Sequence, residues 1–350
     1  MYSLGVITNM YPTPEHPASG TFVEASCRAL RDRGVQVTVC SKPNPSPVAY
    51  PAWYRECYAF LKDHRDTFDL VESAWSPHAA IIPAMYKGSL PFTLRFHGFT
   101  DAGYYKISPA HRWIERYILD RTDAALAVSD RVKQTLRAAR YPEEKIFVVP
   151  PCGVDTDQFR PKPTDTTLFP SSAVVFLYAG RIVREKGMDT LLRVVDHCRA
   201  HTPAARFLLV GTGDPTYIDQ FSKYPNCRVV SPTPHDQMPL WFNVADFLIH
   251  PTFSEGFGMT VVESMACGIP AIASFTGGIR DHLTAQNGIP VRDFMNPMAF
   301  IKAVTLATTL TDNHREFLAQ NARKTILERY TVDRVTQQTI AVHKEVIDRD

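Results

Sequence analysis

The sequence predicts an α/β protein with two doubly wound parallel sheets, and two observations carry this prediction. Short apolar runs alternate with amphipathic helical patterns along most of the 350 residues, a rhythm typical of parallel strands covered by helices on both faces. The rhythm pauses once, in a proline-rich stretch after residue 150, and then restarts. We therefore expect two Rossmann-like domains that face each other across a cleft, which agrees with the chain length.

Six buried strands are expected in the first domain, residues 1–152. The helical patterns between them include residues 20–34 and further helices that open at Pro77, near residue 110 and at residue 130. The strands are short runs rich in Val, Ile, Leu, Ala and Phe, at 4–10, 35–40, 69–75, 92–98, 124–129 and 145–150.

A linker is expected at 153–172, where proline and turn residues replace the apolar periodicity. The second domain, 173–330, then repeats the rhythm of strands and helices. Its expected strands are 174–180, 206–213, 227–231, 245–251 and 270–274. A last helical stretch within 331–350 follows the completed second domain, and we expect this helix to cross back to the first.

Composition excludes several classes of function. A hydrophobic content of 45% and a charged content of 21% are ordinary for a soluble protein, and the net charge of +2 leaves no basic excess for a nucleic-acid partner. The seven cysteines form no C-x-x-C pair, which favours a reducing compartment. The N-terminus lacks a signal-peptide pattern, and no apolar run could span a bilayer. We expect a cytoplasmic protein, with peripheral contact at the inner face of the membrane left open.

Ligands of open parallel sheets bind beyond the carboxyl ends of the strands. The loops expected to contact a ligand are therefore those that follow the strands, at 9–21, 97–105, 180–187, 211–215 and 251–259. In one of them Arg181 follows a strand, Lys186 stands at the start of the next helix, and Gly180 and Gly187 allow sharp turns. Two cations beside a helix N-terminus predict an anion site. A solvated loop with ordinary charges is the alternative.

The stretch 254–263, SEGFGMTVVE, places Glu255 and Glu263 eight positions apart around a glycine turn. A helix is expected to begin at the second glycine or the residue after it, so that the amides at its start suit phosphate oxygens. Carboxylates accept hydrogen bonds well from sugar hydroxyls. A ligand with a central diphosphate and a sugar at each end, such as a nucleotide sugar, would satisfy all these groups.

The same stretch resembles the E-x7-E motif of the family 4 retaining glycosyltransferases, which have the GT-B fold. Other signatures of that family are matched along most of the chain and in the same order. They are NMYPTPEHPASGTFVEASCRAL (9–30), RFHG (95–98), VVPPCGVDTDQFRP (148–161), AGRIVREKG (179–187) and SMACGIPAIASFTGGIRDHL (264–283). Any one of these motifs would be weak evidence for the family, but the whole set in this order is specific to it.

The resemblance implies a role for each matching residue. Arg181 and Lys186 would bind the donor diphosphate, Glu255 the hydroxyls of the transferred sugar, and Glu263 the ribose. His97 would lie over the donor sugar from the first domain and would complete the catalytic set with Arg181, Lys186 and Glu255. The amides of Phe257, Gly258 and Met259 would meet the sugar and phosphate of the donor. Gly20 would let the backbone approach the donor phosphates or the acceptor.

The resemblance also implies a reaction. A hexosyl group would move, with retention, from a UDP- or GDP-linked sugar to a hydroxyl of a glycan, lipid-linked or small-molecule acceptor, as in polysaccharide biosynthesis. The nucleoside diphosphate would leave through an oxocarbenium-like state that the enzyme stabilises electrostatically. No enzyme nucleophile, metal or cofactor is expected.

Two other classes stay open. One is a different GT-B enzyme, such as a nucleotide-sugar epimerase, against which release of nucleoside diphosphate only with an added acceptor would argue. The other is a non-catalytic sugar-binding protein, against which the cation pair and both glutamates argue.

Several sequence features have a plain explanation beside a functional one. Asp155 and Asp157 form a D-x-D pair, the metal motif of another transferase fold, but they lie in the linker signature, so no metal is expected. His197 and His201 lie four apart on a helix without an evident third ligand. The GTGD turn is half of a dinucleotide fingerprint. We expect its Gly213 to lie near the nucleotide base, and the missing glycine spacing argues against an NAD site.

Aromatic and basic segments leave the acceptor side open. Residues 50–60 and 99–117 are rich in aromatic side chains, which could stack on an acceptor sugar or simply pack in the core. Residues 112–140 carry an excess of Lys and Arg. This excess could favour an anionic membrane surface or a lipid phosphate, and a solvated helix pair is the plainer explanation.

Overall fold

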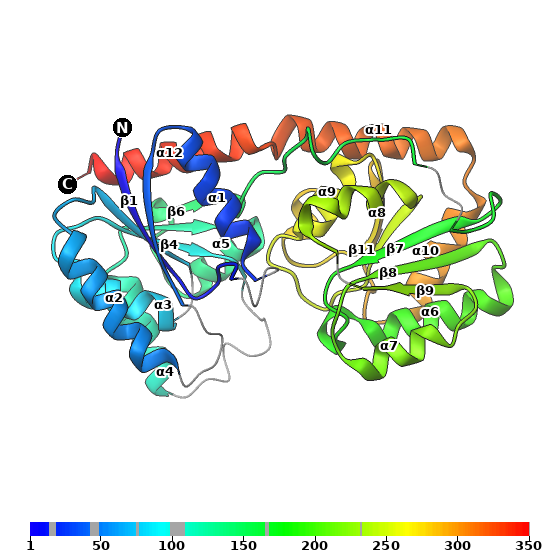
Figure 1. The fold of residues 1–350 in the computed structure, drawn as a ribbon, viewed down its shortest axis with the longest axis horizontal. Coiled ribbons are helices and arrows are strands. Elements are labelled where there is room, and N and C mark those ends of the chain that lie inside the picture. Colours follow the sequence, from blue (N-terminus) through cyan, green and yellow to red (C-terminus); the bar gives the residue numbers. More distant parts are fainter. Residues whose placement is uncertain are drawn as a thin grey trace. The chain divides into compact units, whose positions relative to one another are not determined.

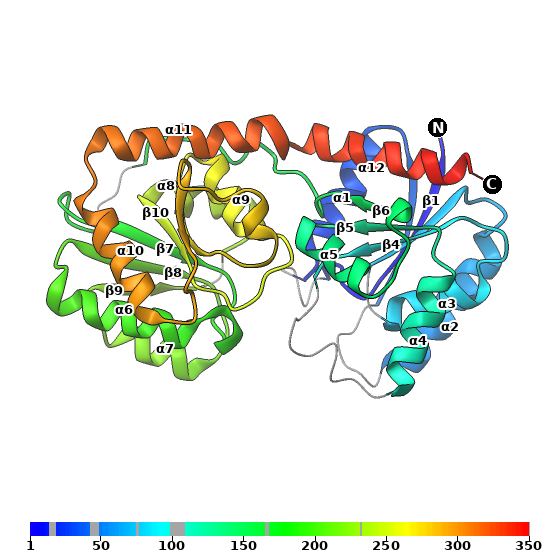
Figure 2. The same cartoon turned by 180° about the vertical axis from the view of Figure 1, so that it is seen from behind.

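The computed structural model describes residues 1–13, 19–42, 49–74, 77–98, 109–164, 168–231 and 233–349. The chain divides into two compact units. The first is Met1–Gly153 together with Val332–Asp350, and the second is Val154–Thr331. In the described residues each unit holds one six-stranded parallel sheet with helices on both faces (Figures 1 and 2). The prediction of two doubly wound α/β units is therefore confirmed.

The sheet of the first unit has the strand order β2-β1-β3-β4-β5-β6. Its strands are β1 (Ser3–Thr8), β2 (Gln36–Ser41), β3 (Leu70–Ala74), β4 (Phe92–Phe96), β5 (Ala124–Ala127) and β6 (Ile146–Val148). The registers are continuous, with Leu4 beside Leu70 and Val71 beside Phe92. Every residue of β3, β4 and β5 is buried, as expected for central parallel strands covered on both faces.

The helices of the first unit form two layers. They are α1 (Thr21–Asp32), α2 (Tyr50–His64), α3 (Pro77–Tyr86), α4 (Pro109–Asp120), α5 (Asp130–Ala138) and α12 (Val332–Ile347). Helices α2, α3 and α4 lie side by side on one face of the sheet, and α1 and α12 pack together over the other (Figures 1 and 2). Val335, Val342 and Val346 of α12 join the apolar core around Leu4 and Leu70.

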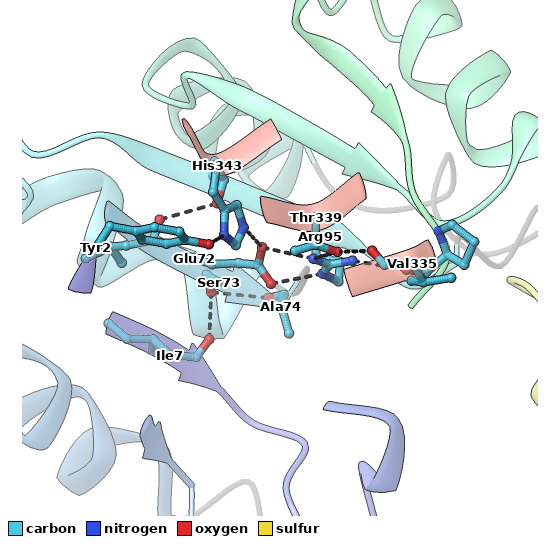
Figure 3. Close-up of polar contacts among 12 residues, drawn as sticks. Tyr2, Ile7, Glu72, Ser73, Ala74, Arg95, Val335, Thr339 and His343 are labelled. Atoms are coloured by element: carbon cyan, nitrogen blue, oxygen red, sulfur yellow. Dashed lines mark hydrogen bonds and ion pairs between the residues drawn. The ribbon is translucent and has the colours of Figure 1, made fainter. Parts of the chain in front are cut away.

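A buried polar network fixes α12 to the sheet (Figure 3). Glu72 of β3 accepts from Arg95 Nε of β4 at 2.9 Å and from His343 Nε2 of α12 at 2.9 Å. The Tyr2 hydroxyl lies 2.7 Å from His343 Nδ1, and Arg95 Nη2 donates to Thr339 at 3.4 Å. Burial alone would raise the pKa of Glu72, but the Arg95 charge and the His343 hydrogen bond hold it well below its usual range. Glu72 is therefore a fully paired buried carboxylate.

The sheet of the second unit has the order β12-β11-β10-β7-β8-β9. Its strands are β7 (Val174–Ala179), β8 (Ala205–Val210), β9 (Cys227–Val230), β10 (Phe247–His250), β11 (Ala271–Ser274) and β12 (Gly288–Val291). The sequence predictions did not include β12. Its four residues, GIPV, contain Pro290, and proline is tolerated in a sheet chiefly at an edge, which is where β12 lies.

The second unit also has helices on both faces of its sheet. They are α6 (Met188–His201), α7 (Pro215–Ser222), α8 (Met238–Val244), α9 (Met259–Ala266), α10 (Pro297–Thr309) and α11 (Asp312–Arg329). Helices α6, α7 and α10 cover one face, and α8, α9 and α11 the other (Figures 1 and 2). Stacked rings of Phe176, Phe207 and Phe247 form the centre of the core under α6 and α10. None of the helices in the described ranges is long and apolar enough to cross a membrane.

The stretch expected as a linker belongs largely to the second unit. Val154 N–H donates to Tyr330 O at 2.8 Å, and Phe159 is buried against the ring of Phe242. Residues 165–167 of that stretch lie outside the described residues.

The strand order of the second unit reverses between β7 and β10. From β7 the chain moves outward to β8 and β9, and then returns to β10 on the other side of β7. The loops after these two neighbouring strands consequently diverge, and a crevice at such a point is where open parallel sheets bind ligands. These are the loops that contain Lys186 and Glu255.

Candidate active site

Glycines lock the loops of this crevice together, backbone against backbone. At Gly187, where φ is +80°, a Cβ atom would lie 1.9 Å from the carbonyl oxygen of Pro251. At Gly213 a Cβ atom would lie 2.1 Å from the carbonyl oxygen of Ile182. The loops after β7, β8 and β10 can therefore approach this closely only because these positions lack side chains.

The loop after β11 supports Glu255 from another side. A Cβ atom at Gly277 would lie 1.6 Å from the Glu255 carbonyl oxygen, and Gly278 N–H donates to that oxygen at 3.3 Å. The backbone of Glu255 is thereby fixed, which leaves its side chain as the adjustable part.

The Glu255 carboxylate has two partners from other segments. Lys186 Nζ lies 2.7 Å from Oε2, and His250 Nε2, at the end of β10, lies 3.3 Å from the same oxygen. Burial alone would raise the pKa of Glu255, but the hydrogen bond from His250 and the charge of Lys186 lower it to about 2. Glu255 is therefore ionised near neutral pH and serves as a hydrogen-bond acceptor.

Glu263 lies in the first turns of α9 with its side chain 11% exposed. His235 Nε2 lies 2.8 Å from Glu263 Oε1. The imidazole of His235 is 48% exposed and rests against the ring of Phe159, with 5.3 Å between centroids. Glu263 thus contacts a half-exposed imidazole that packs on a buried phenyl ring.

Helix α9 begins at Met259, as predicted, with Gly258 before it at φ +92°. The hydrogen-bond ladder of the helix begins with the amides of Val261 and Val262, which donate to Gly258 O. The first amides of an α-helix have no partner within the helix, and the helix dipole favours an anion at this end. The side chain of Phe257 is buried against His282 and Tyr330, so only its backbone can contact a ligand.

Arg181 is placed differently from Lys186. Its guanidinium is 67% exposed and pairs with Glu185 at 3.5 Å, rather than with the Lys186–Glu255 pair. Its backbone is held by Tyr178, whose hydroxyl donates to Arg181 O at 2.5 Å. The structure therefore fixes the loop of Arg181 but leaves its side chain in solvent.

Two of the predicted site residues, Gly20 and His97, belong to the first unit. At Gly20, where φ is +68°, a Cβ atom would lie 2.4 Å from the carbonyl carbon of Met10, so a side chain is excluded. His97 packs on the ring of Phe22, and its buried Nδ1 has no hydrogen-bond partner in the described part of the chain. Burial and the nearby Arg95 charge lower the pKa of His97 to about 3, so it is neutral. Residues 14–18 and 99–105 of the predicted loops lie outside the described residues.

The other candidates have structural partners. Asp155 Oδ1 accepts from the amides of Asp157 and Gln158, each at 3.0 Å, which makes a local turn. The rings of His197 and His201 contact each other on α6, and no group of three or more His, Cys, Asp or Glu within the described ranges could hold a metal.

The residues of the aromatic segment at 50–60 lie in two different environments of the first unit. Trp53 and Cys57 are buried in the core, whereas Tyr50 stacks on His78 at 4.1 Å between centroids. The other aromatic segment, 99–117, lies outside the described residues up to position 108.

Two contacts of the site have no counterpart among the sequence predictions: His250 on Glu255 and His235 on Glu263. One signal in the sequence could have indicated His250, since it is the last residue of a strand that precedes the glutamate by five positions. His235 lies 28 positions before Glu263 with two secondary-structure elements between them, and no local spacing reveals it.

The loops after β7 and β10, together with the helix α9 that follows, therefore carry the Lys186 ammonium, a helix N-terminus and two carboxylates. The cation and the amides suit a diphosphate. The carboxylates suit hydroxyl groups on either side of it.

Comparison with known proteins extends over both units. The family model described as Glycosyltransferase Family 4 matches residues 19–158, and the model described as Glycosyl transferases group 1 matches residues 161–325. A D-inositol 3-phosphate glycosyltransferase of Xylanimonas cellulosilytica is 30% identical over 60% of this chain and 54% of its own length. A GDP-mannose-dependent alpha-(1-6)-phosphatidylinositol monomannoside mannosyltransferase of Mycobacterium tuberculosis is 30% identical over 59% of each chain. The chain thus spans about half the length of the curated relatives it matches.

Solved structures show the same fold at low identity. A sucrose-phosphate synthase from Thermosynechococcus elongatus aligns over 100% of both chains with a TM-score of 0.83 and 18% identity. The Anabaena HepE protein in complex with UDP-glucose covers 99% of this chain and 100% of its own, with a TM-score of 0.73 and 16% identity. With one family model on each half of the chain and this fold around them, the chain belongs to the family 4 glycosyltransferases, which have the GT-B fold.

Proposed function

We propose that this protein transfers a hexosyl group, with retention, from a nucleoside diphosphate sugar to a hydroxyl group of an acceptor. One observation carries the proposal: Lys186 contacts Glu255 in the loops where the strand order reverses between β7 and β10, and the helix that follows Glu255, α9, carries Glu263 in its first turns. The diphosphate would bind Lys186 and the amides at 257–259. The transferred sugar would bind Glu255, and the ribose Glu263.

The state of Glu255 supports its role as a hydroxyl acceptor. Because its pKa is about 2, this carboxylate would remain ionised and could not donate a proton near neutral pH. It lies on the same crevice as the cation that would hold the diphosphate, so a sugar joined to that diphosphate would come within its reach. Such a role needs no covalent intermediate, which separates this site from the carboxylate pair of a retaining glycosidase.

The leaving diphosphate would be stabilised by fixed charges. Lys186 and the helix amides are the groups of the crevice that favour a growing negative charge, and this kind of electrostatic stabilisation is usually the largest contribution to transfer. Arg181 would join them if its exposed side chain turned from Glu185 to the ligand. No metal or cofactor is part of the proposal.

The names of relatives support a nucleotide-linked donor. The Mycobacterium tuberculosis relative is named for GDP-mannose, and the Anabaena protein was solved with UDP-glucose. For this chain we propose a UDP- or GDP-linked hexose as donor and a carbohydrate or lipid-linked acceptor. Peripheral contact with a membrane, the cytoplasmic location and the role of His97 over the donor sugar stay predictions.

A two-step experiment tests the proposal. A thermal-shift panel of UDP- and GDP-sugars identifies the donor, and release of nucleoside diphosphate is then measured with and without candidate acceptors. Release that requires an acceptor, with the anomeric configuration of the donor preserved in the product by NMR, is the expected result. Inversion of that configuration would contradict retention, and interconversion of donor sugars without an acceptor would favour an epimerase.

A further inference from the structure

The two histidines that contact the motif glutamates differ in how they are held. The side chain of His235 is 48% exposed, whereas that of His250 is 5% exposed. His250 is the last residue of β10, and its ring lies parallel to that of Tyr178 in the neighbouring strand β7, at 14° and 6.4 Å between centroids. Tyr178 in turn donates to Arg181 O. His250 is therefore a buried group at the end of β10 that packs against Tyr178 and contacts Glu255.

The hydrogen bond between His250 and Glu255 has a defined direction. An ionised carboxylate can only accept, so His250 donates from Nε2. Its Nδ1 is buried and has no hydrogen-bond partner within the described residues, so the contact with Glu255 is the polar contact that orients the ring. Lys186, the other partner of Glu255, is on a flexible four-carbon stem and 20% exposed.

We propose that His250 is a positioning residue that keeps the Glu255 carboxylate aligned and ionised when Lys186 turns toward the donor diphosphate. The inference rests on the proposed function, in which a diphosphate enters the crevice beside Glu255. A diphosphate attracts the Lys186 ammonium more strongly than a single carboxylate does. The attraction between Lys186 and Glu255 is therefore weakened when Glu255 has to bind the sugar. The hydrogen bond from His250 does not depend on that movement.

The other titratable groups that face Glu255 cannot replace His250. Tyr178 lies under the site, and burial together with the Glu255 charge raises its pKa, so it stays neutral. His282 lies behind Phe257, and burial lowers its pKa to about 3, so it is neutral as well. Of the charged and titratable groups described around Glu255, Lys186 and His250 are the ones that donate to its carboxylate.

Two variants separate the hydrogen bond from the shape of the ring. His250→Phe keeps a ring over Tyr178 but removes the Nε2 donor, whereas His250→Gln keeps a donor of similar reach. For His250→Phe we expect kcat/KM for transfer to fall about tenfold or more near neutral pH, as for one lost hydrogen bond to a charged group. The acid limb of the pH profile should move to higher pH, affinity for the free nucleoside diphosphate should stay nearly unchanged, and His250→Gln should recover most of the activity.

The titration of Glu255 is measured directly and does not depend on turnover. Carboxyl carbons of glutamate are labelled with ¹³C, the Glu255 signal is assigned with Glu255→Gln, and its pKa is compared in wild type and His250→Phe, each with and without UDP or GDP. A higher pKa in the variant, and a larger difference with nucleotide bound, supports the inference. If His250→Phe does not fold, His250→Met against His250→Gln gives the same comparison at matched length.

The inference is overturned if Glu255 titrates alike in wild type and His250→Phe, or if His250→Gln is as inactive as His250→Phe with an unmoved acid limb. These results differ from a failure of the proposed function. That failure would appear as wild-type protein that neither binds nor turns over any nucleotide sugar.

Discussion

The Lys186 ammonium lies 2.7 Å from Glu255 Oε2, and this single contact places a cation beside the start of α9. Replacing Lys186 by Ala should lower the rate of transfer by about 10²-fold or more, because one lost donor to a developing charge costs roughly 3 kcal/mol. The measurement is nucleoside diphosphate release at saturating acceptor.

A matched control for this variant is available in the same loop. Arg184 is exposed and pairs with Asp189 at 3.2 Å, away from both motif glutamates. Arg184→Ala should turn over almost normally. Near-normal turnover by Lys186→Ala would remove the proposed anion site.

Residue types at characteristic spacings predicted Lys186, Glu255 and Glu263, and the structure places Lys186 and Glu255 in direct contact. His250 was not predicted, although its place at the end of a strand, five positions before Glu255, could have indicated it. His235 was beyond such reasoning, because it reaches Glu263 through the fold across 28 positions. Arg181 shows the opposite limit. Its position after a strand was predictable. The direction of its side chain, toward Glu185, depends on which nearby charge it pairs with, and sequence spacing does not show that.

At the scale of elements, Gly187 joins the loop after β7 to the loop after β10. The Cβ of Gly187→Ala would lie 1.9 Å from Pro251 O, so the two loops would have to move apart. We therefore expect this variant to lose most of its nucleotide affinity. Its free energy of unfolding should fall by more than backbone strain alone would cost. Nucleotide titration and urea unfolding give the two quantities.

Gly34→Ala is the control that isolates backbone strain. Gly34 has a similar φ of +82°, but the nearest atom to its Cβ would be the flexible end of Met1 at 3.7 Å. This variant should cost about 1–2 kcal/mol from the left-handed conformation alone and should bind nucleotide normally. Equal costs for the two glycines would mean that the two loops of the crevice can separate freely.

The attachment of α12 to the first sheet can be tested through His343, which is fully buried between Tyr2 and Glu72. His343→Phe should lower the free energy of unfolding by about 2–4 kcal/mol, because it leaves a buried hydroxyl unpaired and a buried carboxylate short of a donor. Adding Tyr2→Phe should return part of that loss, as residues of one network are not additive. A loss below about 0.5 kcal/mol, typical of a surface substitution, would contradict the role of the network.

Element boundaries were predictable where one periodicity dominated. The strands β7, β8 and β10 are apolar runs that end in a glycine or proline turn, and α9 begins directly after Gly258. The edge strand β12 was missed because four residues with a proline carry no alternating pattern. The network of Figure 3 was equally out of reach, since it joins Tyr2 to His343 across 341 positions of the sequence.

At the scale of the whole molecule, the order of the signatures matches the family along both units, and the predicted reaction needs no metal. We expect transfer to continue in the presence of EDTA, because Lys186 and the helix amides would stabilise the leaving diphosphate. The test compares nucleoside diphosphate release before and after chelation. Loss of activity that Mg²⁺ or Mn²⁺ restores would contradict this expectation and would support a metal-binding role of Asp155 and Asp157.

The claim on which the account depends is that Glu255 binds the transferred sugar and Glu263 the ribose, and calorimetry with UDP, GDP and the identified donor tests it most directly. Glu263→Ala should weaken the nucleoside diphosphate and the donor alike, since both contain the ribose. Glu255→Ala should leave nucleoside diphosphate binding nearly intact and weaken only the donor, each lost bond costing about 1.5–3 kcal/mol. Equal loss of nucleoside diphosphate affinity in both variants, or loss in neither, would contradict the assignment of the site.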